Sequence, residues 1–105
     1  MEDIKFSTNW NNKLNCKAFT TIRLANPRKY FEGGLYNIYL KEKQIGIAAI
    51  MQIIPFKLVQ LSDSISYLDT GYNKTETTRI FKQMYPNYDF EANELYLMTL
   101  LFSSR

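Results

Sequence analysis

The apolar run IGIAAIMQIIPF, at positions 45–56, constrains the fold of this chain more than any other stretch. It is rich in isoleucine, is interrupted by Gln52 and closes on proline and phenylalanine, so it predicts a long, largely buried strand. It is too short to span a membrane. Gly46 and the Ala48-Ala49 pair permit close approach of a neighbouring backbone, which favours a strongly curved sheet or a barrel corner.

Further strands are predicted wherever apolar residues alternate or β-prone residues gather. These segments are 3–7, 18–24, 35–40 and 93–102. Between them, the asparagine-rich residues 8–15 predict a turn or a single helical turn, residues 25–34 a loop, and residues 41–44 a polar hairpin connection.

Two helices are predicted after the long strand, where the hydrophobic period changes. For the first, Ser62 is the expected N-cap, Ile65 and Leu68 the apolar face, and Gly71 the C-terminal stop. For the second, Asn73 and Glu76 have the spacing of a capping box and Pro86 marks the end. Its expected inward face comprises Thr77, Ile80, Phe81 and Met84.

The order of these elements predicts a mixed α/β (α+β) fold in one domain over residues 1–105. We expect a small, closed or nearly closed β-barrel of about five to six strands, with two helices inserted before the last strand. A chain of 105 residues suits one domain with one core. Closure of the barrel would remove the exposed edges of the sheet.

The composition limits the kinds of catalytic and metal site that the chain can form. The chain has no histidine and one cysteine, Cys16, so a zinc site is not expected and the usual general base is missing. We expect no cofactor, no metal and no membrane partner, a cytoplasmic location, and Cys16 as a small buried side chain. Residues 1–43 carry eight Lys or Arg against four acidic residues, which is compatible with a phosphate-bearing partner or with an ordinary solvated surface.

The stretch CKAFTTIR, residues 16–23, is the first candidate site. On an extended chain Thr21 and Arg23 share one face, while Thr20 and Ile22 share the other. Arg23 would offer a fork of donors to a carboxylate, a phosphate or a base edge. Thr21 could act as a nucleophile with Lys17 as its base. The alternative is a strand whose threonines favour β geometry and whose arginine pairs with an acid.

A second candidate site is YLDTGY, residues 67–72, in the break between the helices. Asp69 could pair with Arg23 or Lys17 or orient a ligand amine, and Tyr72 could stack on a base. The alternative is a plain helix C-cap. Near the N-terminus, Asn9 could contact a base edge, whereas we expect Trp10 in the core.

Together these residues resemble the ASCH domains of the PUA-like superfamily. The resemblance rests on KAFTTIR, YFEGGLYNIYL, IGIAAIMQIIPF and LDTGYNKTETTRIFKQMYP, in the family's order over roughly residues 4–102. It implies a PUA-like β-barrel with a cleft between barrel and helices that binds RNA or a modified nucleoside. A small bacterial branch of the family removes the acetyl group of N4-acetylcytidine, using a lysine, a threonine and a glutamate.

The resemblance places the family's threonine at Thr21 and its arginine at Arg23. The family's lysine position falls on Ala18, one residue after Lys17, and its carboxylate position falls near Thr70, next to Asp69.

Three hypotheses follow for the function. The first is a binder of RNA or a modified nucleoside, and the second is an amidohydrolase on an acylated nucleobase. The third is a protein-interaction module with an inert cleft. The candidate catalytic residues are Lys17, Thr21 and Asp69, and the candidate ligand-binding residues are Asn9, Thr20, Arg23, Thr70 and Tyr72.

Overall fold

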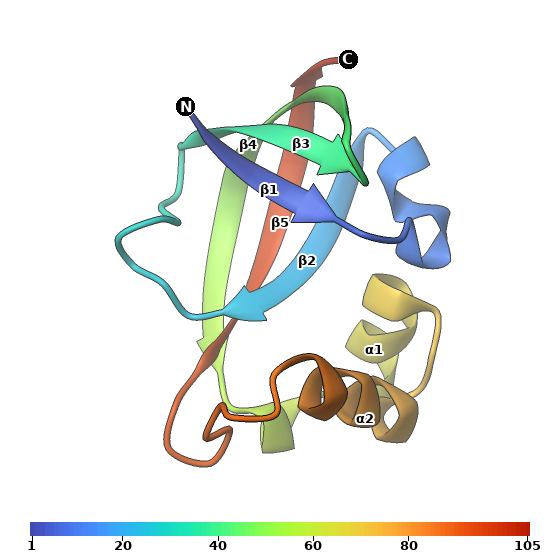
Figure 1. The fold of residues 1–105 in the computed structure, drawn as a ribbon, viewed down its shortest axis with the longest axis vertical. Helices are drawn as coiled ribbons and strands as arrows, with labels where there is room; N and C mark the ends of the chain where they lie inside the picture. Colours follow the sequence, from blue (N-terminus) through green and yellow to red (C-terminus); the bar gives the residue numbers. More distant parts are fainter.

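The computed structural model describes all residues 1–105 as a curled five-stranded sheet with two α-helices at one end (Figure 1). The strands are β1 (Glu2–Phe6), β2 (Ala18–Leu24), β3 (Leu35–Leu40), β4 (Lys43–Phe56) and β5 (Leu95–Ser104). The helices α1 (Asp63–Thr70) and α2 (Lys74–Met84) lie between β4 and β5. Two 3-10 helices, η1 (Trp10–Asn15) and η2 (Leu58–Gln60), complete the chain.

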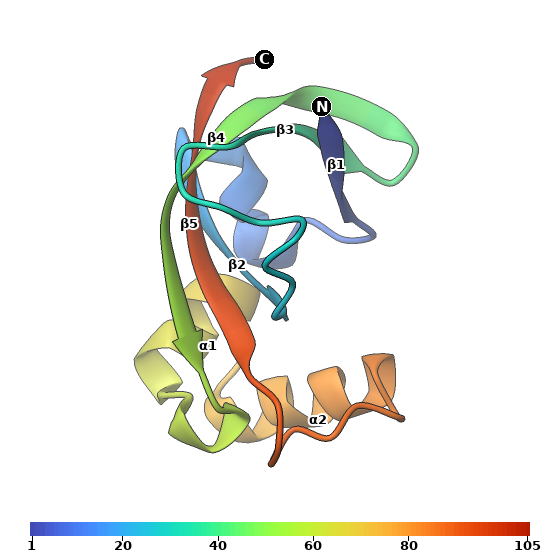
Figure 2. The same cartoon turned by 90° about the vertical axis from the view of Figure 1, so that its left-hand side faces the viewer.

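The strand order is β1-β3-β4-β5-β2. Strand β1 runs parallel to β3, and the other three pairs are antiparallel. Since β1 and β2 do not pair, the sheet forms a half-barrel with an open seam instead of the closed or nearly closed barrel expected from the sequence (Figure 2). The α+β class, the five strands and the two helices before the last strand are confirmed.

The curl of the sheet arises in β4. Its pairing with β5 shifts register between Ile47 and Ala48 and again between Ile50 and Gln52. Such bulges bend a strand and increase its twist. A Cβ on Gly46 would clash with the backbone carbonyl oxygen of Ser104, so glycine is needed where these strands approach. The expectation of a close approach at Gly46 is confirmed.

Two hydrophobic clusters hold the layers together. The first fills the inside of the curl and includes Ile4, Phe19, Tyr36, Met98 and Leu100. The second lies between the sheet and the helical end and comprises Ile22, Leu58, Leu61, Phe81 and Leu95. Because consecutive residues of a strand face opposite sides, β2 contributes Phe19 to one cluster and Ile22 to the other.

The expected helix signals are present in the structure. The Ser62 hydroxyl accepts from the Ile65 amide, Gly71 ends α1 with a φ of 84°, and the Asn73 side chain accepts from the Glu76 amide.

Some of the buried faces predicted for the helices are wrong. Leu68 is 62% exposed and Met84 is 51% exposed, while the buried residues of α1 are Ser66, Asp69 and Thr70.

Three further features concern the rest of the chain. Cys16 is exposed and not buried as expected, because it follows η1 at the surface, where its backbone is extended. The hairpin between β3 and β4 is also shorter than expected, since β4 already begins at Lys43. No helix is long and apolar enough to cross a membrane.

Tyr36 makes the fold sensitive to alkali. Its hydroxyl donates to the Lys29 carbonyl at 2.6 Å and accepts from the Phe31 amide at 3.2 Å, and burial raises the pKa of Tyr36. A group whose pKa is raised by folding stabilises the fold below its unfolded pKa of about 10, and this contribution is lost as pH rises through the folded pKa.

We therefore expect the free energy of unfolding to fall as pH rises beyond about 10, and to fall less steeply in Tyr36→Phe. At pH 7 the same substitution should cost about 1–2 kcal/mol, since it removes the hydrogen bond to Lys29. Urea unfolding at several pH values measures both effects. Tyr67→Phe, at an exposed tyrosine, is the control. An identical pH slope for wild type and Tyr36→Phe would contradict the assignment.

Candidate functional site

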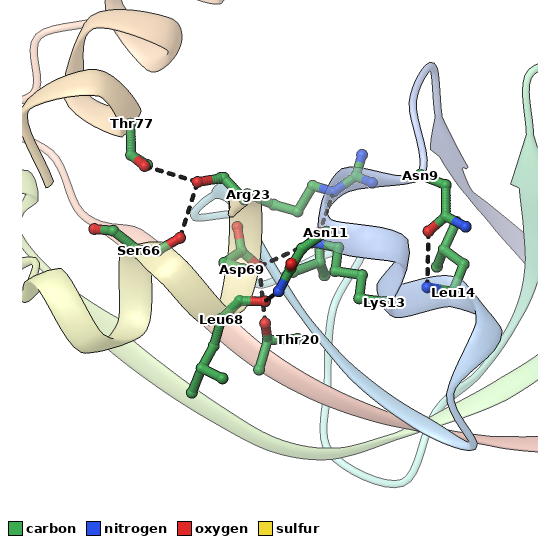
Figure 3. Close-up of polar contacts among 12 residues, drawn as sticks. Asn9, Asn11, Lys13, Leu14, Thr20, Arg23, Ser66, Leu68, Asp69 and Thr77 are labelled. Carbon is green, nitrogen blue, oxygen red and sulfur yellow. Dashed lines mark hydrogen bonds and ion pairs between the residues drawn. The ribbon is translucent and has the colours of Figure 1, made fainter. Parts of the chain in front are cut away.

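A buried ion pair joins η1 to α1. The Lys13 ammonium donates to Oδ1 of Asp69 at 2.9 Å, and their side chains are only 7% and 5% exposed. The Thr20 hydroxyl of β2 donates to the same oxygen at 2.9 Å. Figure 3 shows Asp69 between Lys13 and Thr20, so this one carboxylate connects a 3-10 helix, a strand and an α-helix.

The asparagines of residues 8–15 place Lys13 at this position. Asn11 and Asn12 adopt left-handed backbone angles, which asparagine tolerates better than most residues, and they turn the chain sharply within η1. The Asn9 carboxamide oxygen accepts from the Leu14 amide at 2.9 Å. The Asn11 side chain donates to the carbonyls of Tyr67 and Leu68, near the C-terminal end of α1.

Arg105 fixes η1 from its other side. Its guanidinium donates to three successive carbonyls, those of Leu14, Asn15 and Cys16, at 2.7, 3.3 and 2.8 Å. It also lies over the ring of Phe102, 4.2 Å from the ring centroid. These contacts hold the carbonyl end of η1 against the residues at the end of β5.

A small cavity of about 70 Å³ opens beside the ion pair. Its polar lining includes Lys13, Thr21, Arg23, Asp69 and Thr70, and its walls carry four aromatic rings, Phe6, Trp10, Phe81 and Tyr85. Water occupies about 30 Å³ per molecule in the liquid, so the cavity has room for a few solvent molecules or for one edge of a planar ligand.

Asp69 has one oxygen that makes no hydrogen bond within the protein. Both of its hydrogen bonds go to Oδ1, and every buried side-chain nitrogen or oxygen in the chain has a partner. Oδ2 makes no hydrogen bond within the protein and is therefore not completely buried, although the Asp69 side chain as a whole is only 5% exposed. The Lys13 ammonium has three donors and gives one to Asp69. The cavity therefore offers a carboxylate acceptor beside ammonium donors.

Burial governs the charge of Lys13. Removal from water lowers the pKa of its ammonium, and the positive charge of Arg23 lowers it further. The charge of Asp69 and its hydrogen bond act in the opposite direction and raise it, but the pKa of Lys13 remains below that of an ordinary lysine. Lys13 thus gives up its proton more readily than a surface lysine.

Arg23 spans the open seam of the half-barrel. Its Nε donates to the Thr21 hydroxyl oxygen at 3.0 Å, and its Nη2 donates to the Lys5 carbonyl of β1 at 2.8 Å. Its guanidinium also lies over the Phe6 ring, 4.6 Å from the centroid. Because the Thr21 oxygen already accepts from Arg23, its own proton remains available to a ligand or a base.

The structure brings together some of the candidate residues chosen from the sequence. Thr21, Arg23, Asp69 and Thr70 line the cavity, and Thr20 contacts it indirectly through Asp69. The Thr70 hydroxyl donates to the Ser66 carbonyl, shares a 2.8 Å hydrogen bond with the Thr77 hydroxyl and accepts from the Tyr72 amide.

Three other candidates lie outside the cavity lining. Lys17 is exposed, its carbonyl accepts from the Phe102 amide, and Asp69 pairs with Lys13 instead of Lys17 or Arg23. Asn9 stabilises η1. Tyr72 is 48% exposed and packs edge-on against Trp10, which is half-buried and lines the cavity instead of lying in the core.

Lys13 is the important residue that sequence reasoning missed. Lysine is rarely buried unless it is paired, and WNNKLN contains no acidic residue that would suggest a partner. Its partner lies 56 residues away in sequence. The available signal was the run of asparagines around it, since residues that favour tight local turns can place a neighbouring side chain precisely against a distant element.

No family model, curated protein or solved structure matches this chain. The structure also contains no group of three His, Cys, Asp or Glu side chains that could hold a metal ion.

The buried pair predicts strong coupling between Lys13 and Asp69. Lys13→Met would leave a buried carboxylate with one hydroxyl partner, so it should cost about 3–5 kcal/mol of the free energy of unfolding. The double variant Lys13→Met/Asp69→Leu should lose much less than the sum of the two single variants. Denaturant unfolding of all four proteins measures this coupling, and additive losses would contradict it.

Proposed function

We propose that the chain is a PUA-like domain that binds one base of a single-stranded RNA or of a free modified nucleoside. The observation that carries this proposal is the cavity in which the Lys13–Asp69 pair, Thr21 and Arg23 converge among aromatic rings. The two helices inserted between β4 and β5, before the last strand, support the PUA-like assignment, whereas the sheet is a half-barrel and not a closed barrel.

The polar groups of the cavity match the edge of a cytosine. Its N4 amine is a donor and would reach Oδ2 of Asp69, while its N3 is an acceptor for Lys13 or the Thr21 hydroxyl. Single-stranded bases are read at their Watson–Crick edges in this way and stack on aromatic side chains. Trp10 and Tyr85 are the rings of the lining that are not part of a buried core cluster.

The small volume of the cavity limits what enters it. About 70 Å³ admits the edge of a base, so the sugar and any phosphate would remain outside, near the seam. Lys5 and Arg23 lie at that seam and line the cavity as well. They place positive charge where a backbone phosphate would emerge.

Binding of cytidine tests this proposal. We expect saturable binding of cytidine by calorimetry or NMR titration, and binding of uridine weaker by roughly tenfold or more, because the uridine O4 would face the Asp69 carboxylate. Thr21→Val removes the hydroxyl at nearly constant volume and should weaken cytidine binding by roughly tenfold. Thr99→Val, at a half-buried threonine of β5, should leave it unchanged.

Equal affinities for cytidine and uridine would contradict recognition of the base edge. A short cytosine-containing RNA that binds much more tightly than cytidine, with affinity falling as salt rises, would assign the RNA strand as the ligand. Equal affinities for cytidine and the RNA, insensitive to salt, would assign the free nucleoside.

A second candidate function is hydrolysis of an acylated base amine such as that of N4-acetylcytidine. The lowered pKa of Lys13 favours it, because a lysine that loses its proton more readily can act as a general base. Here Lys13 takes the role that the sequence suggested for Lys17. The Thr21 oxygen would attack the acyl carbon, its proton would pass to neutral Lys13, and Lys13 would return that proton to the base amine as the bond between the acyl carbon and N4 breaks. Water would then release the acyl group from Thr21.

Release of cytidine from N4-acetylcytidine tests the second candidate. We expect product with wild type and none with Thr21→Val, with Thr99→Val as the active control. The rate should rise with pH through the lowered pKa of Lys13, because only neutral Lys13 accepts a proton. Saturable binding of N4-acetylcytidine without release of cytidine would leave the domain a binder alone.

A further inference from the structure

A second concave site lies on another face of α2. This groove has a volume of about 540 Å³, within the range of small-molecule sites, and shares no lining residue with the cavity beside Lys13. It is lined by Lys57, Leu58, Val59, Lys74, Thr78, Lys82, Phe90 and Glu91. Lys74, Thr78 and Lys82 are four residues apart on α2, so they project from one side of the helix.

The groove gathers positive charge that no carboxylate neutralises by an ion pair. Three ammonium groups line it against one carboxylate, that of Glu91, and neither of the two ion pairs in the chain involves these residues. A chain with a net charge of +3 therefore places an excess of two positive charges in this one groove. Such a concentration of charge of one sign attracts an anion.

Two of the three ammonium groups are held in place. Lys57 Nζ donates to the carbonyls of Glu91 and Ala92 at 3.0 and 2.8 Å, and Lys74 Nζ donates to the carbonyl of Val59 at 2.8 Å. Both lysines are half-buried. An ammonium has three donors, so Lys57 retains one and Lys74 retains two. Their position is fixed before any ligand arrives, which reduces the entropy cost of binding.

The walls of the groove add an apolar component. Val59 is 78% exposed, and the half-buried Phe90 packs edge-on against Tyr88 with a centroid distance of 5.0 Å. Phe90 also packs against the cluster beneath the helices, so its ring is fixed. An inorganic ion would use only the ammonium groups, whereas a ligand with a ring would also cover Val59 and Phe90.

We propose that this groove binds a small organic phosphate, in which a phosphate monoester contacts Lys57, Lys74 and Lys82 and an attached planar or apolar group packs on Phe90. Phosphate matches a cluster of lysines because its dianion accepts several charge-assisted hydrogen bonds at once. The Thr78 hydroxyl supplies one further donor. This site is independent of the nucleobase function proposed for the cavity at Lys13.

Titration with phenyl phosphate, followed by amide NMR shifts, tests the proposal. We expect saturable shifts at Thr78, Lys82 and Phe90, and an affinity at least roughly tenfold higher than that of inorganic phosphate, because only the ester covers the apolar wall. Lys82→Gln should weaken phenyl phosphate binding by roughly tenfold. Since Lys82 makes no side-chain hydrogen bond or ion pair, this substitution removes a charge without breaking a contact of the fold.

Lys43→Gln is the matched control, because Lys43 begins β4 at the end opposite to Lys57. Unchanged binding by Lys43→Gln together with weaker binding by Lys82→Gln would support the site. An equal loss in both variants would reveal a general charge effect and overturn the proposal. Equal affinities for phenyl phosphate and inorganic phosphate would overturn the role of the apolar wall, and an absence of saturable shifts would overturn the site.

Discussion

The ion pair between Lys13 and Asp69 is the interaction on which the arrangement of the site depends. It is the only contact in which η1, α1 and β2 meet on one atom, since Thr20 donates to the same oxygen. A buried pair of this kind is retained only where each charge keeps its partner. The burial of Asp69 on α1 meets this need, because an apolar residue at this position would leave Lys13 without a carboxylate.

The sequence predicted the elements better than their assembly. Strands, helices and caps follow from local signals, so Ser62, Gly71 and Asn73 were placed correctly. The buried face of α1 was predicted wrongly because the spacing of its apolar residues places Leu68 on the inside. In the structure Leu68 is exposed and Asp69 is buried, because Asp69 pairs with a residue that is distant in sequence. Lys13 was missed for the same reason. Its role is defined by a residue that is remote in sequence, and local patterns carry no information about such a pair.

The open seam of the half-barrel explains why polar groups collect where they do. A closed barrel would satisfy the edges of β1 and β2 by backbone pairing, but here a side chain, that of Arg23, crosses between them to the Lys5 carbonyl. The same guanidinium holds Thr21. One residue therefore contributes both to the integrity of the sheet and to the lining of the cavity, which couples the shape of the site to the width of the seam.

The position of β5 between β4 and β2 has a consequence for the order in which the molecule folds. Strand β5 is the only neighbour of β2 in the sheet, although most of the chain separates the two strands in sequence. During synthesis, β2 therefore remains unpaired until the segment from Leu95 onward has left the ribosome. Contacts so distant in sequence form slowly, because a long loop must close first. The cavity lined by Thr21 and Arg23 is thus among the last parts of the molecule to form, and a nascent chain cannot bind a ligand there.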